Sequence, residues 1–183
     1  MRYWFTADLH LGHFNIIKYC NRPFKTLEEM NNTLIRNWNS RVKKEDVIFY
    51  VGDFCFKNSP GGKTGEGVPI KAKEWENKFN GKIIYIRGNH DKNNSTKTII
   101  EKLTIRYGNK YITLIHNPSY VSLDTSINFV GHIHNNWSIK RIKRGNGFTD
   151  AINVGVDVHN FAPVTFEELM KKYRKWKKEN KYE

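Results

Sequence analysis

Five short apolar runs in this chain end directly in residues that can bind a metal ion or move a proton. The run at 83–86 leads through an arginine and a glycine into Asn89, His90 and Asp91. Short runs rich in β-branched residues are typical of strands buried on both faces of a sheet. A glycine lets the backbone turn sharply where such a strand ends. The polar side chains are therefore predicted to lie at the carboxyl end of a strand, where open α/β sheets bind their ligands.

The same arrangement recurs four more times. The other apolar runs and their polar ends are 4–7 with Asp8 and His10, 47–51 with Asp53, 112–115 with His116, and 127–130 with His132 and His134. Random placement would scatter these polar residues over loops and helices. Two of the pairs are spaced two residues apart, so in an extended segment their side chains would point the same way. The pattern favours one shared site.

The order of these motifs is Asp-x-His, Gly-Asp, Gly-Asn-His-Asp, His and Gly-His-x-His. It resembles the calcineurin-like metallophosphoesterase superfamily over residues 8–134, and every block of the family pattern is filled. The opening segment DLHLGH at 8–13, followed by NII at 15–17, is similar to a small, single-domain prokaryotic or phage branch of that superfamily. The resemblance implies an α/β fold, a four-layer α/β/β/α sandwich of two mixed sheets flanked by helices. The alternation of strands and helices followed by late hairpins predicts the same two-sheet sandwich.

Seven candidate ligands are too many for one metal ion, and they suit two divalent ions about 3.5–4 Å apart that share a carboxylate. The set of Asp, His and Asn, which lacks a thiolate, favours Mn²⁺, Fe or Zn²⁺, with Ni²⁺ or Co²⁺ as possible substitutes. The resemblance implies that Asp53 bridges the two ions. It also implies how the other ligands divide between them: Asp8, His10 and His134 for one ion, and Asn89, His116 and His132 for the other.

The ions would activate a water or hydroxide for attack on a phosphorus atom. By the same resemblance, His90 would act as the general acid or stabilise charge at the phosphate, and Asp91 would orient it. Arg87, His13 and Asn89 are candidate substrate contacts. For Arg87 a surface ion pair is an equal alternative, and for His13 a structural hydrogen bond is a close one.

We therefore expect a metal-dependent phosphoric ester hydrolase. A phosphodiesterase is favoured because the chain is small, has no recognisable cap domain and carries a net charge of +13. A phosphomonoesterase with the same ligands, or a basic nucleic-acid-binding module with a structural metal site, are the alternatives. The charge suits a nucleotide or nucleic acid as partner, although a solvated surface of a lysine-rich chain explains it equally well.

The remaining features predict one domain over residues 1–183 in the cytoplasm. The sequence lacks an apolar stretch of membrane-spanning length and a signal peptide, and Cys20 and Cys55 are expected to be reduced thiols. A glycine-rich loop at 57–69 would either fold over the site or remain a plain surface loop. His159 is given a structural role. The expected helices are 15–20, 26–40, 70–79, 95–103 and one starting at Thr165, with hairpins turning at 108–109 and 144–147.

Overall fold

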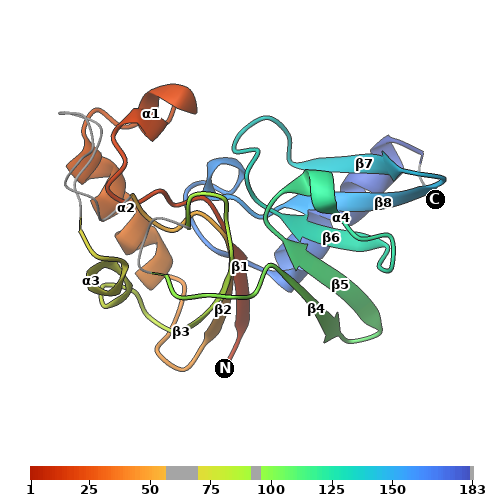
Figure 1. Cartoon of the computed structure of the whole chain (residues 1–183), viewed down its shortest axis with the longest axis horizontal. Coiled ribbons are helices and arrows are strands. Elements are labelled where there is room, and N and C mark those ends of the chain that lie inside the picture. The colour runs from red at the N-terminus through yellow and green to blue at the C-terminus, as the bar shows by residue number, and fades with distance from the viewer. Residues whose placement is uncertain (57–69, 92–95, 182–183) are drawn as a thin grey trace.

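The computed structural model describes residues 1–56, 70–91 and 96–181, and Figure 1 shows two sheets lying side by side with helices around them. The loop expected at 57–69 lies outside the described residues. In the part of the chain that the structure describes, no helix is both long and apolar enough to cross a membrane. Cys20 and Cys55 are buried free thiols.

The first sheet has the strand order β3-β2-β1-β9. Its first three strands in the chain are parallel, and the short β9 pairs antiparallel with β1. The bounds are β1 Tyr3–Thr6, β2 Val47–Val51, β3 Lys82–Ile86 and β9 Val164–Thr165. The sequence does not predict β9, because two residues are too few to show an alternating pattern.

The expectation that the run at 83–86 is buried on both faces is wrong. Ile86 is buried, but Ile83, Ile84 and Tyr85 are only half-buried. The reason is topological, since β3 is the edge strand of its sheet. The apolar runs of the central strands β1 and β2 are the ones in this sheet that are buried over most of their length.

The second sheet has the strand order β4-β5-β6-β8-β7 and is also mixed. Both predicted hairpins are present, with the first turning at 108–109 and the second at 145–146. The bounds are β4 Lys102–Tyr107, β5 Lys110–Ile115, β6 Ile127–Val130, β7 Ile139–Arg144 and β8 Gly147–Asn153.

Three of the predicted helices are confirmed, and the bounds of the four observed helices are α1 Asn15–Tyr19, α2 Leu27–Asn39, α3 Ala72–Glu76 and α4 Phe166–Glu179. The Thr26 side chain caps α2 by accepting from the backbone of Glu29. Thr165 and Glu168 form the full capping box that opens α4.

Two helix predictions need correction. The helix expected at 70–79 is shorter, covering only α3. The helix expected at 95–103 is wrong for the described residues 96–103, which run without helical structure into β4. Thr98 donates to the carbonyl of Tyr85, and Arg87 donates to the carbonyl of Ile100, so this segment is bound alongside the end of β3.

The core lies in two main parts. One part joins the first sheet to α1, α2 and α3, with Trp38, Ile48 and Tyr50 fully buried. The other lies between the sheets, where Phe5 packs edge-on against Phe129 at a ring distance of 4.9 Å. These two mixed sheets with flanking helices confirm the expected α/β fold class.

Helix α4 packs on the core that lies between the two sheets. Phe166 of α4 packs on Phe129, the same residue that Phe5 of the first sheet contacts. Leu169 and Met170 join the core between the sheets. The helix therefore flanks both sheets and covers part of the core between them.

Candidate metal centre

The polar ends of the strands meet where the two sheets come together. The loop after β1 is bound to the loop after β2, since Asp8 donates to the carbonyl of Gly52 at 3.0 Å. The loop after β6 is bound to the end of β5 through Gly131 and the carbonyl of His116, also at 3.0 Å. The backbone amide of His132 then joins the two sheets, because it donates to both carboxylate oxygens of Asp8, at 3.1 and 2.9 Å.

Two clusters of possible metal ligands result. Asp8, His10 and His134 each offer one ligand atom, and these atoms lie within 4.8 Å of one another. The same holds for Asp53, His116 and His132. The clusters divide the histidines in the same way as the ligand sets that the resemblance implies.

Asp53 lies between the clusters. Its Oδ2 atom is 3.6 Å from Nε2 of His10 and 3.3 Å from Nε2 of His116. One carboxylate oxygen thus faces a histidine of each cluster. A carboxylate in this position is suited to bridging two cations, because it offsets part of their repulsion.

Asn89 joins the second cluster. Its Oδ1 atom lies 2.9 Å from Nε2 of His116 and 2.8 Å from Nδ1 of His132. The three atoms are the ones by which an amide and two imidazoles bind a metal, and they converge on one another. Asn89 is itself exposed, so this part of the centre is open to solvent.

The backbone at this site is held in a conformation that L-residues rarely adopt. The candidate ligands with a positive φ are Asp8, His10, Asp53, His132 and His134, with values from 48° to 73°. Outside glycine this region costs energy and persists only where the surrounding structure enforces it. Five of the seven candidate ligands share it, so the strand tips are shaped for the site.

The residues fit bound metal ions. Nε2 of His10 is buried and has no hydrogen-bond partner among the described residues, although such an atom is costly unless something binds it. His116 donates from Nδ1 to the carbonyl of Val51 at 2.8 Å, which leaves the Nε2 lone pair facing Asn89 and Asp53. A Cβ atom on Gly131 or Gly155 would lie 2.9 or 2.8 Å from Oδ2 of Asp8, so the backbone closes tightly around that carboxylate.

The electrostatics of the protein without metal reflect this crowding. Burial raises the pKa of Asp8 to about 6. Burial alone would also raise the pKa of Asp53, but the hydrogen bond and charge of His116 outweigh it and hold that pKa well below its ordinary value. In return, Asp53 and Asp8 overcome burial and raise the pKa of His116 to about 9. Bound cations would take the place of these protons.

His90 and Asp91 differ in burial and in what their side chains contact. His90 is exposed, and its ring lies 5.5 Å from that of His10, so its side chain borders the candidate centre. Asp91 is buried and accepts hydrogen bonds from the backbone amides of Asp53 and Gly88 through Oδ2 and of Phe54 through Oδ1. These bonds fix the loops that carry Asp53 and His90.

The other candidate substrate contacts are Arg87 and His13. Arg87 lies 3.8 Å from the carboxylate of Glu101, which is the surface ion pair given above as its alternative. The ring of His13 lies 5.9 Å from that of His10 and stacks with Phe56 at 5.1 Å, so it borders the first cluster.

Two residues that sequence reasoning missed connect to the site. Arg22 is fully buried and binds Asp157, whose Oδ2 lies 3.2 Å from Nδ1 of His134. Arg22 follows no apolar run, and the run before Asp157 is interrupted by Asn153 and Gly155, so neither residue matched the pattern. His159 has the structural role assigned to it, since its Nε2 donates to the carbonyl of Asn153 at 2.8 Å.

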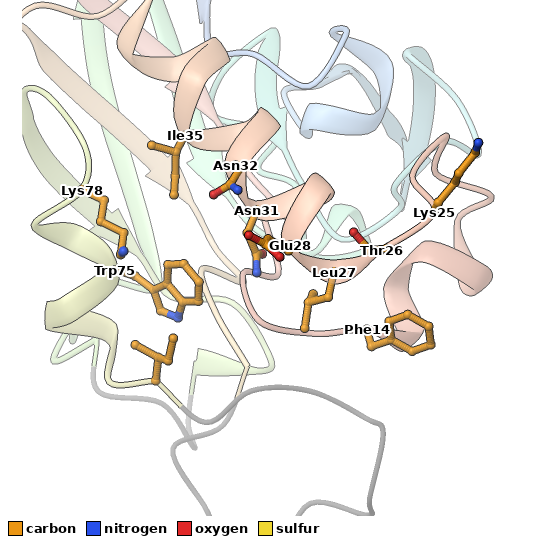
Figure 2. Close-up of a pocket in the computed structure, with 11 residues that line it drawn as sticks. Phe14, Lys25, Thr26, Leu27, Glu28, Asn31, Asn32, Ile35, Trp75 and Lys78 are labelled. Carbon is orange, nitrogen blue, oxygen red and sulfur yellow. The ribbon is translucent and has the colours of Figure 1, made fainter.

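A hollow of about 480 Å³ between α2 and α3 lies outside this centre. Figure 2 shows Leu27, Asn31 and Ile35 of α2 on one side and Trp75 on the other. Among the described residues, its lining includes none of the candidate ligands. Its walls are mostly apolar, so we place no chemistry there.

Comparison with known proteins identifies the family. The family model described as calcineurin-like phosphoesterase matches residues 1–181. The chain belongs to this family. It is 38% identical over 173 residues to the uncharacterized protein MJ1445 of Methanocaldococcus jannaschii, covering 93% of this chain and 90% of that protein. It is also 36% identical over 88 residues to the gene 66 protein of Mycobacterium phage L5, covering 48% of this chain and 39% of that one.

The fold of this calcineurin-like phosphoesterase has a counterpart among solved structures. A protein of unknown function, AQ665 from Aquifex aeolicus, superposes with a TM-score of 0.65 at 20% identity and covers 92% of this chain and 97% of its own. The family match confirms the resemblance read from the motifs. It supports a hydrolase of phosphate esters that uses divalent metal ions.

Proposed function

We propose that this chain is a single-domain phosphodiesterase with a dinuclear metal centre, in which Asp53 bridges the two ions. The observation that carries the proposal is the position of Asp53 Oδ2, within 3.6 Å of His10 Nε2 and 3.3 Å of His116 Nε2. Asp8, His10 and His134 hold one ion, and Asn89, His116 and His132 hold the other. When bound, such ions lower the pKa of water toward 7 and neutralise charge on the phosphate oxygens.

The side chains of the centre divide the remaining work. Asp53 and Asp8 supply the negative charge that keeps two cations close together. Asn89 is a neutral ligand and is exposed, so it lies where a phosphate oxygen can reach it. His90 borders the centre from the solvent side and donates a proton or a hydrogen bond to the leaving-group oxygen.

The preference for diesters follows from access and charge. Asn89 and His90 are exposed, so a second ester substituent has room beside the centre. The net charge of +13 attracts polyanions, including nucleotides and nucleic acids. Mn²⁺, Fe and Zn²⁺ are the metals that this donor set favours.

A substrate panel tests the proposal. The Mn²⁺-loaded protein is assayed with matched phosphodiesters, phosphomonoesters and cyclic phosphates that carry the same leaving group. We expect kcat/KM for the diester to exceed that for the monoester by at least about tenfold. A monoester preference would replace the diester assignment with a phosphatase. Failure to hydrolyse any ester, together with salt-sensitive binding of DNA or RNA, would favour the nucleic-acid-binding module.

A further inference from the structure

A buried ion pair lies next to the first cluster of ligands. Nε of Arg22 is 2.8 Å from Oδ1 of Asp157, and Nη2 is 3.0 Å from Oδ2, so the pair is bidentate. The side chains are 0% and 2% exposed. A fully buried charge pair of this kind is costly to desolvate and is weak evidence for stability alone. Its position therefore calls for another explanation.

The guanidinium of Arg22 also binds the backbone of the loop after β1. Nη2 donates to the carbonyl of Asp8 at 2.7 Å, and Nη1 donates to that of Leu9 at 2.9 Å. Asp8 and His10 have φ values of 59° and 51° in this loop. The two hydrogen bonds thus hold a strained segment in the shape that directs both side chains toward the cluster.

The carboxylate of Asp157 acts on the third ligand of the cluster. Its Oδ2 lies 3.2 Å from Nδ1 of His134. An acceptor at Nδ1 keeps the proton on that nitrogen and leaves the Nε2 lone pair for a metal ion, as carboxylates do for metal-binding histidines elsewhere. The pair therefore connects ligands from two sheets, because Asp8 follows β1 and His134 follows β6.

A third metal position at Asp157 is a poorer explanation. Cys20, His134 and Asp157 also offer ligand atoms within 4.8 Å of one another. However, the guanidinium of Arg22 already occupies both oxygens of Asp157. A second cation there would be repelled by a charge that cannot be deprotonated.

We propose that Arg22 and Asp157 are positioning residues that assemble the Asp8, His10 and His134 ligands, so that the pair sets the affinity of that one ion. The second ion is held by Asn89, His116 and His132, whose described contacts do not include the pair. The inference rests on the dinuclear centre proposed above. It adds that the pair controls the affinity of the protein for one of the two ions and not for the other.

The test is a Mn²⁺ titration of the whole protein, in which binding is monitored through the electron paramagnetic resonance signal of free Mn²⁺. Single substitutions would leave a buried charge unpaired, so the main variant is Arg22→Met combined with Asp157→Leu. We expect one binding step to weaken by 10–100-fold and the other to change by less than about threefold. The variant Asn89→Ala, which removes a ligand of the second ion, is expected to weaken the other step.

The matched control is Arg141→Met combined with Asp150→Leu. This pair has the same bidentate distances, 2.8 and 3.0 Å, but joins β7 to β8. It should leave both binding steps unchanged. If the main variant does not fold, Arg22→Lys keeps a positive charge opposite Asp157 but loses the bidentate geometry, and it should weaken the same step by about three- to tenfold.

Two other outcomes would overturn separate claims. If the wild-type protein binds two ions and the Arg22 and Asp157 variants lose only thermal stability, the pair is structural and this inference is wrong. If the wild-type protein binds fewer than two ions, the dinuclear centre itself fails.

Discussion

Nε2 of His10 faces Oδ2 of Asp53 across 3.6 Å, and it has no hydrogen-bond partner among the described residues. A buried imidazole nitrogen at this distance from a carboxylate oxygen is too far for a hydrogen bond and well placed for a shared cation. Burial lowers the pKa of His10 well below its ordinary value, so the ring is neutral and can offer a lone pair.

Removing the bridging carboxylate should prevent the centre from holding two ions. In Asp53→Asn the amide cannot offset the repulsion of two cations, so we expect at most one ion per chain and a loss of at least about 100-fold in kcat. Metal content measured by mass spectrometry and a diester assay give the result. Asp46→Asn is the control, because Asp46 caps backbone amides at the opposite end of the same strands and should affect stability without changing metal content.

Removing the candidate acid should separate binding from chemistry. His90→Ala should lower kcat by about 10²–10⁴-fold, the usual contribution of general acid catalysis, while both ions stay bound. Because His90 is exposed, the free energy of unfolding should change by less than about 0.5 kcal/mol. Hydrolysis at the wild-type rate would remove His90 from the mechanism.

Asp91 should behave as a residue that holds the loops in place. Asp91→Asn replaces a carboxylate that accepts from three backbone amides, so we expect the free energy of unfolding to fall by about 3 kcal/mol in a urea titration. Asp124→Asn, at an exposed carboxylate, should change it by less than about 0.5 kcal/mol. If Asp91→Asn leaves stability intact and lowers only kcat, Asp91 acts through His90 rather than by holding the loops.

His159 should make the stability of the metal-free protein sensitive to acid. Burial lowers its pKa from 6.5 to about 4, with Lys172 and Arg41 adding to the effect and Glu168 opposing it. The unfolded chain therefore binds more protons between these pH values. The stabilisation that the neutral His159 ring contributes is at most roughly 3 kcal/mol. It is complete above pH 6.5 and is lost as the pH falls to about 4.

This dependence can be measured as the difference in Tm between pH 7 and pH 5 in the presence of a chelator. His159→Gln keeps a donor for the carbonyl of Asn153 and removes the titration, so its Tm should change less than that of the wild type. Equal changes in the two proteins would exclude His159 as the source.

The sequence predicted the strands, and the grouping of the candidate ligands at their ends, because both depend on local patterns. The runs at 47–51 and 127–130 became strands with those bounds, and all seven candidate ligands lie at the junction of the sheets. The helix predicted at 95–103 failed because tertiary hydrogen bonds to β3 outweighed its local propensity. The prediction that β3 is buried on both faces was wrong because a sequence does not show which strand lies at the edge of a sheet.

The residues that support the site were harder to predict. Arg22 lies in a loop, and Asp157 is 23 residues from the His134 that it contacts. Asp91 was found by its place in the Gly-Asn-His-Asp motif, but its bonds to backbone amides depend on the fold of the loop after β2. Such contacts are made across the chain, so spacing alone carries no signal for them.

The most direct test is the anomalous scattering of crystals of the protein grown with Mn²⁺. Two peaks about 3.5–4 Å apart, on either side of Oδ2 of Asp53, are predicted. One peak would then lie beside Asp8, His10 and His134, and the other beside Asn89, His116 and His132. A single peak, or peaks away from Asp53 under saturating Mn²⁺, would contradict the shared-carboxylate centre.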